Sequence, residues 1–157
     1  MVNNTAKTTP KVSIGMPVFN GGVTIRDALE SLLAQTFTDF ELIISDNGST
    51  DDTEEICREY DAADERIRYV RQPNNRGAVA NWAFVLDQAV GEYFMWAAHD
   101  DLWDSSYIYE LTSVLDADSS VGLAFSGRAL FNRSTGVKTF YLTGYTTSRF
   151  KLFRYLF

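Results

Sequence analysis

The chain has 157 residues, enough for one domain with a hydrophobic core, and its 45% hydrophobic and 14% aromatic content excludes an intrinsically disordered protein. Its net charge of −7 argues against a general nucleic-acid-binding surface. No apolar run approaches the roughly 18 residues that span a bilayer, residues 1–10 contain no apolar signal core, and the single cysteine suits a reducing compartment. We therefore expect a cytoplasmic protein, with residues 1–10 as a disordered lead-in and 11–157 as a single domain.

Short apolar runs alternate with segments whose apolar residues recur every three or four positions. This alternation predicts crossover units and a mainly parallel sheet flanked by helices. Pro17 is expected to end the first strand. The predicted strands are 11–16, 40–45, 67–71 and 93–98. Three of the predicted helices are 23–34, 77–90 and 105–115. A fourth helix, after the second strand, is capped by Ser49 or Thr50 and ends near residue 60.

Residues 119–157 differ from the rest in composition: six of them are basic and none is acidic, whereas all 21 acidic residues of the chain precede them. The patterns at 121–131 and 137–142 predict two strands joined by a hairpin turn at 132–136. Residues 147–157 mix aromatic and basic residues and predict a helix with apolar residues on many faces. One alternative is that such a helix packs on the body of the protein. The other is that it contacts a membrane surface or another partner, and membrane contact would place the protein at the inner face of the membrane.

Two adjacent carboxylates, Asp100 and Asp101, follow the apolar run 93–98 directly after His99. The carboxyl end of a buried strand is where open α/β sheets bind ligands. Hard divalent cations such as Mg²⁺ or Mn²⁺ take oxygen ligands, commonly one or two carboxylates together with substrate phosphates. The pair therefore predicts a metal site, and the alternative is that both residues cap the next helix or turn in solvent.

Two further strand ends carry polar or aromatic groups that such a ligand needs. The loop P-V-F-N at 17–20 has an aromatic residue that can pack on a base, and Asp46 with Asn47 ends the second strand, where a carboxylate can accept an N–H from a uracil-like ring. Arg76 lies in the loop after the third strand and can neutralise a diphosphate together with a metal. A glycine-rich phosphate cradle is absent from the sequence, so phosphate charge has to be met by metal and side chains.

Four segments between residues 11 and 103 carry a resemblance to a known family: V-S-I-G-M-P-V-F-N, S-L-L-A-Q-T-F-T-D-F-E-L-I-I-S-D-N-G-S-T-D-D-T, N-R-G-A-V-A-N-W and A-V-G-E-Y-F-M-W-A-A-H-D-D. In this order and spacing, the chain resembles a family 2 glycosyltransferase with the GT-A fold. The resemblance implies an α/β fold with a Rossmann-like, mainly parallel sheet, to which the residue patterns after 119 add the C-terminal hairpin and helix. It also implies an enzyme that uses Mn²⁺ or Mg²⁺ to move a sugar from a nucleotide-sugar, a UDP-sugar in the first place, to a saccharide, lipid or protein acceptor.

Position by position, the family's donor site falls on named residues of this chain. The chain departs from the family's D-x-D-D element because Ala98 stands at the place of the first Asp, with His99 in the variable place as a candidate replacement ligand. By the resemblance, the donor-site residues are Pro17, Val18, Phe19 and Asn20 for the nucleoside pocket, Asp46 and Asn47 for the base edge, Arg76 for the base or diphosphate, Asp100 for the ribose and metal, and Asp101 as the first metal ligand.

A second departure concerns the catalytic base. Most members of the family are similar to inverting enzymes that use a downstream carboxylate to deprotonate the acceptor hydroxyl, and this chain has no Asp or Glu after Asp118. We expect the donor-binding part of a transferase without its acceptor-side part, with Asp104 as the alternative base. A nucleotide-sugar-binding or interaction module without turnover is the second hypothesis. A phosphoacceptor receiver domain is the third, although Lys138 and Lys151 lie in poor contexts for the lysine that it needs.

Overall fold

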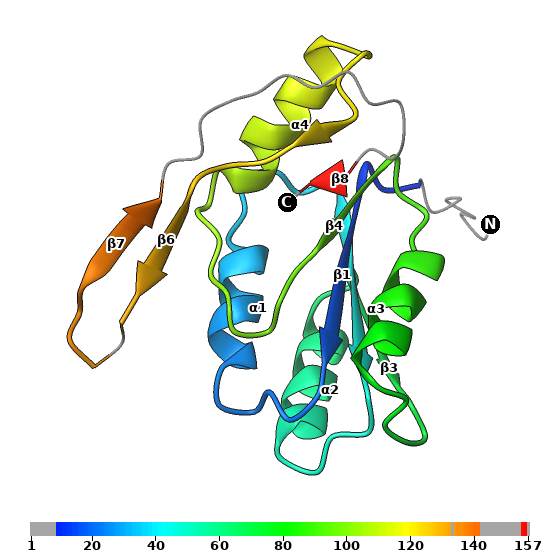
Figure 1. Cartoon of the computed structure of the whole chain (residues 1–157). Coiled ribbons are helices and arrows are strands. Elements are labelled where there is room, and N and C mark those ends of the chain that lie inside the picture. The colour runs from blue at the N-terminus through cyan, green and yellow to red at the C-terminus, as the bar shows by residue number, and fades with distance from the viewer. Residues whose placement is uncertain (1–8, 133, 142–154, 157) are drawn as a thin grey trace.

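A parallel sheet forms the centre of the computed structural model, which describes residues 9–132, 134–141 and 155–156 (Figure 1). Within these residues the sheet has six strands in the order β3-β2-β1-β4-β8-β5, and every neighbouring pair is parallel. The α/β fold predicted from the sequence is confirmed. The strands are β1 (Val12–Val18), β2 (Phe40–Asp46), β3 (Ile67–Arg71), β4 (Tyr93–Trp96), β5 (Leu123–Ala124) and β8 (Tyr155–Leu156).

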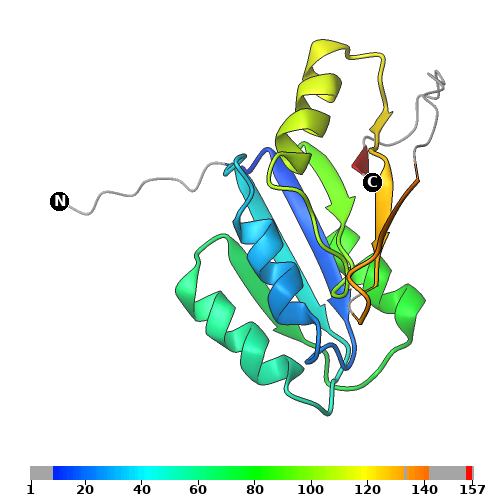
Figure 2. The ribbon, with the colours of Figure 1, turned by 90° about the vertical axis from the view of Figure 1, so that its left-hand side faces the viewer.

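Helices cover both faces of the sheet (Figure 2). The larger core cluster packs apolar residues of three helices against the even-numbered residues of β1, such as Ile14, and of β2, such as Leu42. The smaller cluster joins Val85 of the remaining helix to Ile43 and Phe94 on the opposite face. Because both faces are covered, all residues of β1 are buried, and its sequence lacks a polar alternation. The first face carries α1 (Ile25–Leu33), α2 (Thr53–Ala63) and α4 (Tyr107–Ala117), and the second carries α3 (Ala78–Asp87).

β1 continues through Pro17 to Val18, so the prediction that Pro17 ends the strand was wrong. The odd-numbered residues of β1 direct their backbone groups towards β4, since the Gly15 carbonyl accepts a hydrogen bond from Ala97 N. Pairing with β4 stops at Gly15. Pro17 therefore stands where no donor is needed, and a proline is tolerated at such a position.

Two predicted boundaries near the site also shift. β4 ends at Trp96 instead of Ala98, which leaves the following residues free to turn. α2 begins at Thr53, and neither Ser49 nor Thr50 caps it. Asp51 holds its first turn instead, because the Asp51 carboxylate accepts a hydrogen bond from Thr53 N at 3.1 Å.

The predicted hairpin is present as an antiparallel pair of β6 (Arg128–Phe131) and β7 (Lys138–Tyr141), which stands out from the body in Figure 1. Its turn ends at Gly136, whose φ of 71° is the left-handed region that glycine adopts readily. The strand predicted over 121–131 is divided into β5 and β6.

The helix predicted over 147–157 is wrong at its two described residues. Tyr155 and Leu156 form β8, which lies between β4 and β5 and pairs with both. The edge of β4 would otherwise present unpaired backbone groups, and a further strand satisfies them. Residues 147–154 and 157, like residues 1–8 of the predicted lead-in over 1–10, lie outside the described residues. None of the described helices is both long and apolar enough to cross a membrane.

Candidate functional site

A cleft of about 270 Å³ opens beside the carboxyl ends of β1 and β4. The strand order reverses there, because the chain adds β2 and β3 on one side of β1 and then places β4 on the other. Such a switch point is where open parallel sheets bind ligands. The ends of β1 and β2, the α3 region and the segment after β4 line the cleft with Pro17, Val18, Phe19, Asn47, Asn75, Ala78, Asn81, Trp82, Ala98, His99 and Asp100.

Phe19 lines the cleft and is 43% exposed, as a residue that packs on a ligand should be. Asn20, which follows it, is not among the lining residues. The Asn20 backbone has a φ of 53°, which is uncommon for a residue other than glycine. Its side-chain Oδ1 accepts a hydrogen bond from Thr50 N at 2.9 Å. Asn20 therefore shapes the loop that carries Phe19 and does not itself face the cleft.

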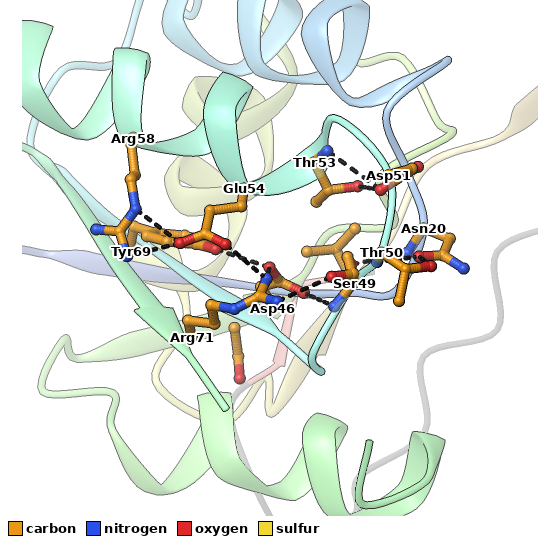
Figure 3. Close-up of polar contacts among 12 residues, drawn as sticks. Asn20, Asp46, Ser49, Thr50, Asp51, Thr53, Glu54, Arg58, Tyr69 and Arg71 are labelled. Carbon is orange, nitrogen blue, oxygen red and sulfur yellow. Dashed lines mark hydrogen bonds and ion pairs between the residues drawn. The ribbon is translucent and has the colours of Figure 1, made fainter. Parts of the chain in front are cut away.

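Asp46 also lies outside the cleft, although the sequence predicted it at the base edge. Its side chain has no exposed surface, and its oxygens already accept three hydrogen bonds (Figure 3). Oδ1 accepts from Ser49 N, and Oδ2 accepts from the Tyr69 hydroxyl and from Arg71 Nη1, each at 2.7 Å. In this arrangement Asp46 cannot reach a ligand, because three protein donors enclose it.

Asn47, the next residue, does line the cleft. Its amide nitrogen donates to Asn75 Oδ1 at 2.9 Å, and its Oδ1 accepts from Arg76 N at 2.9 Å. Asn47 therefore holds the loop between β3 and α3 against the end of β2. The Arg76 backbone takes part in this contact while the residue itself is exposed at the rim, so Arg76 lies next to the cleft without lining it.

Three lining residues from α3, namely Ala78, Asn81 and Trp82, were missing from the predicted site. The Asn81 amide is buried, accepting from Ser45 Oγ and donating to the Ser45 carbonyl at 2.8 Å, which fastens α3 to β2. Trp82 is 40% exposed and lies 5.9 Å from Trp96 between ring centroids. The available signal was a polar Asn within an apolar helix segment. Apolar periodicity alone does not show that Trp82 lies where the apolar face of the helix leaves the core and reaches the cleft.

The segment after β4 brings His99 and Asp100 into the cleft, with Asp101 beside them. The His99 Nδ1 lies 3.1 Å from Thr24 Oγ1, which attaches this segment to the start of α1. Partial desolvation and the adjacent Asp100 charge raise the pKa of Asp101 above its ordinary value. A bound cation would relieve this repulsion between the two carboxylates.

The residues present fit a hard divalent cation, with the ligand phosphates as partners. Asp100 and Asp101 are exposed carboxylates that can each supply oxygen. Among the described residues, no three His, Cys, Asp or Glu side chains gather into a complete metal site. Mg²⁺ and Mn²⁺ commonly use one or two carboxylates and take further oxygens from substrate phosphates and water. The replacement of the family's first Asp by Ala98 leaves the chain dependent on such partners.

Asp104, the alternative base, has a structural contact. Its Oδ1 accepts hydrogen bonds from the backbone and the hydroxyl of Ser106, both at 2.9 Å, at the start of α4. These hydrogen bonds hold the pKa of Asp104 below its ordinary value. A carboxylate with a lowered pKa is a weaker proton acceptor, so this position suits a helix cap better than a catalytic base.

The sequence of the chain is similar to those of known glycosyltransferases. The chain is 32% identical over 136 residues to the glycosyltransferase GlyG of Streptococcus pneumoniae, a match that covers 85% of this chain and 44% of that protein. It is 38% identical over 93 residues, 59% of this chain and 30% of the other, to a Campylobacter jejuni protein named GalNAc(5)-diNAcBac-PP-undecaprenol beta-1,3-glucosyltransferase. The chain thus spans less than half the length of these relatives.

A solved structure has a closely similar fold. The S. aureus TarS fragment 1–349 in complex with UDP-GlcNAc superposes with a TM-score of 0.71 at 25% identity, over 81% of this chain and 36% of the other. The model of the family described as Glycosyl transferase family 2 matches residues 13–155. This match covers the sheet except for its first and last residues, all four helices and every residue that lines the cleft, and the chain therefore belongs to glycosyl transferase family 2.

Proposed function

We propose that the cleft binds a UDP-sugar and that the protein transfers the sugar to an acceptor hydroxyl. The observation that carries this proposal is the convergence of Phe19, Asn47 and Asp100 on one cleft at the switch point of the sheet. An aromatic ring, amide groups and carboxylates are the groups that a base, a ribose and a metal-bound diphosphate require. The UDP complexes of a structural neighbour support the choice of nucleotide.

In the proposed complex, the uracil ring packs on Phe19, and the base edge faces Asn47 and Asn75. This assignment replaces Asp46 by its neighbour, since Asp46 is enclosed by protein donors. The exposed Arg76 lies at the same rim and supplies positive charge to the diphosphate.

Asp100 and Asp101 would hold Mn²⁺ or Mg²⁺, which neutralises the charge of the departing nucleoside diphosphate when bound. Asp100 also lies in the cleft, where it can accept a hydrogen bond from a ribose hydroxyl. The residues of this chain thus bind and orient the donor.

Transfer with inversion requires a base that takes the proton of the acceptor hydroxyl. No Asp or Glu follows Asp118 in the sequence, and Asp104 is engaged at the start of α4. We therefore assign donor binding, and not acceptor activation, to the described cleft. The acceptor is a saccharide, lipid or protein that presents a hydroxyl group.

Titration calorimetry with UDP and UDP-GlcNAc in Mn²⁺ tests donor binding. We expect a Kd on the order of 10⁻⁶ to 10⁻³ M, with weaker binding of GDP as the control nucleotide. Phe19→Ala should weaken UDP binding because the exposed ring is lost from the cleft. The proposal would be abandoned if neither uridine nucleotide produced binding heat in Mn²⁺.

A module that binds the donor without transferring the sugar is the second candidate. Ala98 in place of the family's first Asp favours it. The two candidates differ in turnover, which is measured as UDP release from UDP-GlcNAc with and without a panel of acceptors. Release that accelerates with an acceptor supports the transferase, and release at the rate of the buffer control supports the module.

A further inference from the structure

A buried network centred on Asp46 connects β3 and α2 to the loop that carries Phe19 (Figure 3). We propose that Asp46 is a positioning residue, which sets the 46–53 loop so that this loop holds Asn20 and thereby keeps Phe19 in the donor cleft. The inference rests on the proposed function for its second test only. It gives Asp46 a role that requires no contact with the ligand.

Ser49 is the first link, because its backbone is held on both sides. The Ser49 N–H donates to Asp46 Oδ1 at 2.7 Å, and the Ser49 carbonyl accepts from Arg71 Nη2 at 2.9 Å. Arg71 is itself attached to Asp46, through Nη1 at 2.7 Å, and to Glu54 of α2 at 3.1 Å. Asp46 thus fixes Ser49 directly and also through Arg71.

Tyr69 completes the set of donors around Asp46. Its hydroxyl donates to Oδ2 at 2.7 Å. Burial and the negative charge of Asp46 raise the pKa of Tyr69 well above its ordinary value, so the phenol keeps the proton that it donates. A buried carboxylate is stable only when it is paired in this way.

The second link joins the 46–53 loop to three consecutive backbone amides of the β1–α1 loop. Asn20 N donates to Ser49 Oγ, Gly21 N to Thr53 Oγ1 and Gly22 N to Asp51 Oδ2, each at 2.9 Å. In return, the Asn20 side chain accepts from Thr50 N. The 46–53 loop therefore holds the backbone of the three residues that follow Phe19.

The conformation of Asn20 indicates why such a loop is needed. A φ of 53° is costly for a residue with a Cβ atom, and it persists only where surrounding contacts hold it. The contacts of Ser49 and Thr50 hold it here. Relaxation of Asn20 would turn the chain at Phe19, whose ring lines the cleft.

Hydrogen exchange of the ligand-free protein provides the first test. In Asp46→Asn, an amide NH₂ replaces one acceptor oxygen and meets a donor, so we expect the amides of residues 20–22 to exchange at least roughly tenfold faster. Asp64→Asn is the matched control, because Asp64 also accepts from an arginine, Arg66, but at the opposite end of β3. Unchanged exchange of residues 20–22 in folded Asp46→Asn would overturn the inference.

Ser49→Ala is the second variant, in case the buried Asp46 substitution prevents folding. It removes only the acceptor of Asn20 N. The inference predicts faster exchange at residue 20, with the α2 amides unchanged. Exchange at the wild-type rate would again contradict it. Neither result depends on nucleotide binding, so this test separates the inference from the proposed function.

A double-mutant cycle with UDP and Mn²⁺ provides the second test. Phe19→Ala and Asp46→Asn should each raise the Kd for UDP by roughly tenfold. The double variant should have the same Kd as Phe19→Ala alone. This result is expected because Asp46 acts through Phe19. If the increases in Kd of the two single variants multiply in the double variant, Asp46 acts independently of Phe19, and the inference is overturned. If the wild-type protein does not bind UDP, the proposed function fails, and hydrogen exchange decides the positioning role.

Discussion

Asp46 and Asn47 are adjacent in the chain, yet their side chains lie on opposite sides of the sheet. Successive residues of a strand point to opposite faces. Asp46 follows Leu42 and Ile44 in facing α2, where Arg71 and Tyr69 enclose it. Asn47 faces the cleft beside α3. A shift of one residue therefore separates a buried positioning group from a group that can contact a ligand.

The two carboxylates after β4 should differ in their dependence on metal. We expect Asp101→Asn to weaken UDP binding roughly tenfold in Mn²⁺ and to change it little in EDTA, because the lost oxygen serves the cation. Asp100→Asn should have a smaller metal-dependent effect if Asp100 also serves the ribose. Calorimetry in both buffers measures the difference.

Asp104→Asn is the control for this pair, since the Asp104 carboxylate contacts Ser106 before α4 and Asp104 does not line the cleft. It should leave the UDP affinity unchanged in either buffer. An equal loss for Asp101→Asn with and without Mn²⁺ would instead show that Asp101 supports the fold of the segment.

Cys57 should be unreactive in the folded protein. Burial, together with the nearby charge of Asp46, raises the pKa of its thiol to about 12. The reactive thiolate is therefore scarce below that pH, and the buried sulfur is also inaccessible. A chromogenic disulfide reagent at pH 8 should report no thiol until denaturant unfolds the protein. Stoichiometric labelling of the native protein at the rate of free cysteine would refute this expectation.

At the scale of elements, α3 packs tightly against the sheet at Gly15 of β1. A Cβ atom at this position would lie 2.7 Å from Val85 Cγ2 and 2.8 Å from the Phe94 ring. These atoms belong to a packed core and have little room to move. The glycine in the first strand thus permits the helix to cover the centre of the sheet.

Gly15→Ala should consequently lower the free energy of unfolding, by about 1–3 kcal/mol. Urea denaturation followed by circular dichroism measures the change. Gly22→Ala is the comparison, because there the nearest atom to the added Cβ is the movable carboxylate oxygen of Asp51. A smaller loss is expected for Gly22→Ala, and equal losses would contradict the packing argument.

At the scale of the whole molecule, stability is unequally distributed. β1 is buried along its whole length and pairs on both sides, with β2 and β4. The β6–β7 hairpin forms a separate two-stranded sheet, and Leu130 and Val137 in it are exposed. A two-stranded ribbon is at best marginally stable by itself.

Hydrogen exchange should follow this division. Amides of β1 and β2 are expected to exchange only through global unfolding, whereas those of β6 and β7 should exchange through local opening, by orders of magnitude faster. Added denaturant should accelerate exchange strongly in β1 and weakly in the hairpin. Similar protection in both regions would mean that the hairpin is part of the main cooperative unit.

The sequence predicted the fold class, the four alternating strand and helix units and the family, and all of these are confirmed. These features depend on local patterns: apolar periodicity, loop residues and the order of short motifs. The convergence of Phe19, Asn47 and Asp100 could be anticipated as well. Parallel strands present their carboxyl ends at one edge, so the residues that follow them meet there.

Only the tertiary structure decided which of these residues face the cleft. Pro17 lies within β1 because the neighbouring strand has already ended, and Tyr155 joins the sheet because β4 offers an unpaired edge. Asp46 is enclosed because Tyr69 and Arg71 lie in the strand that pairs with β2. Each outcome depends on partners far away in the chain. The local sequence does not identify these partners, because the same short segment can pair with different neighbours in different folds.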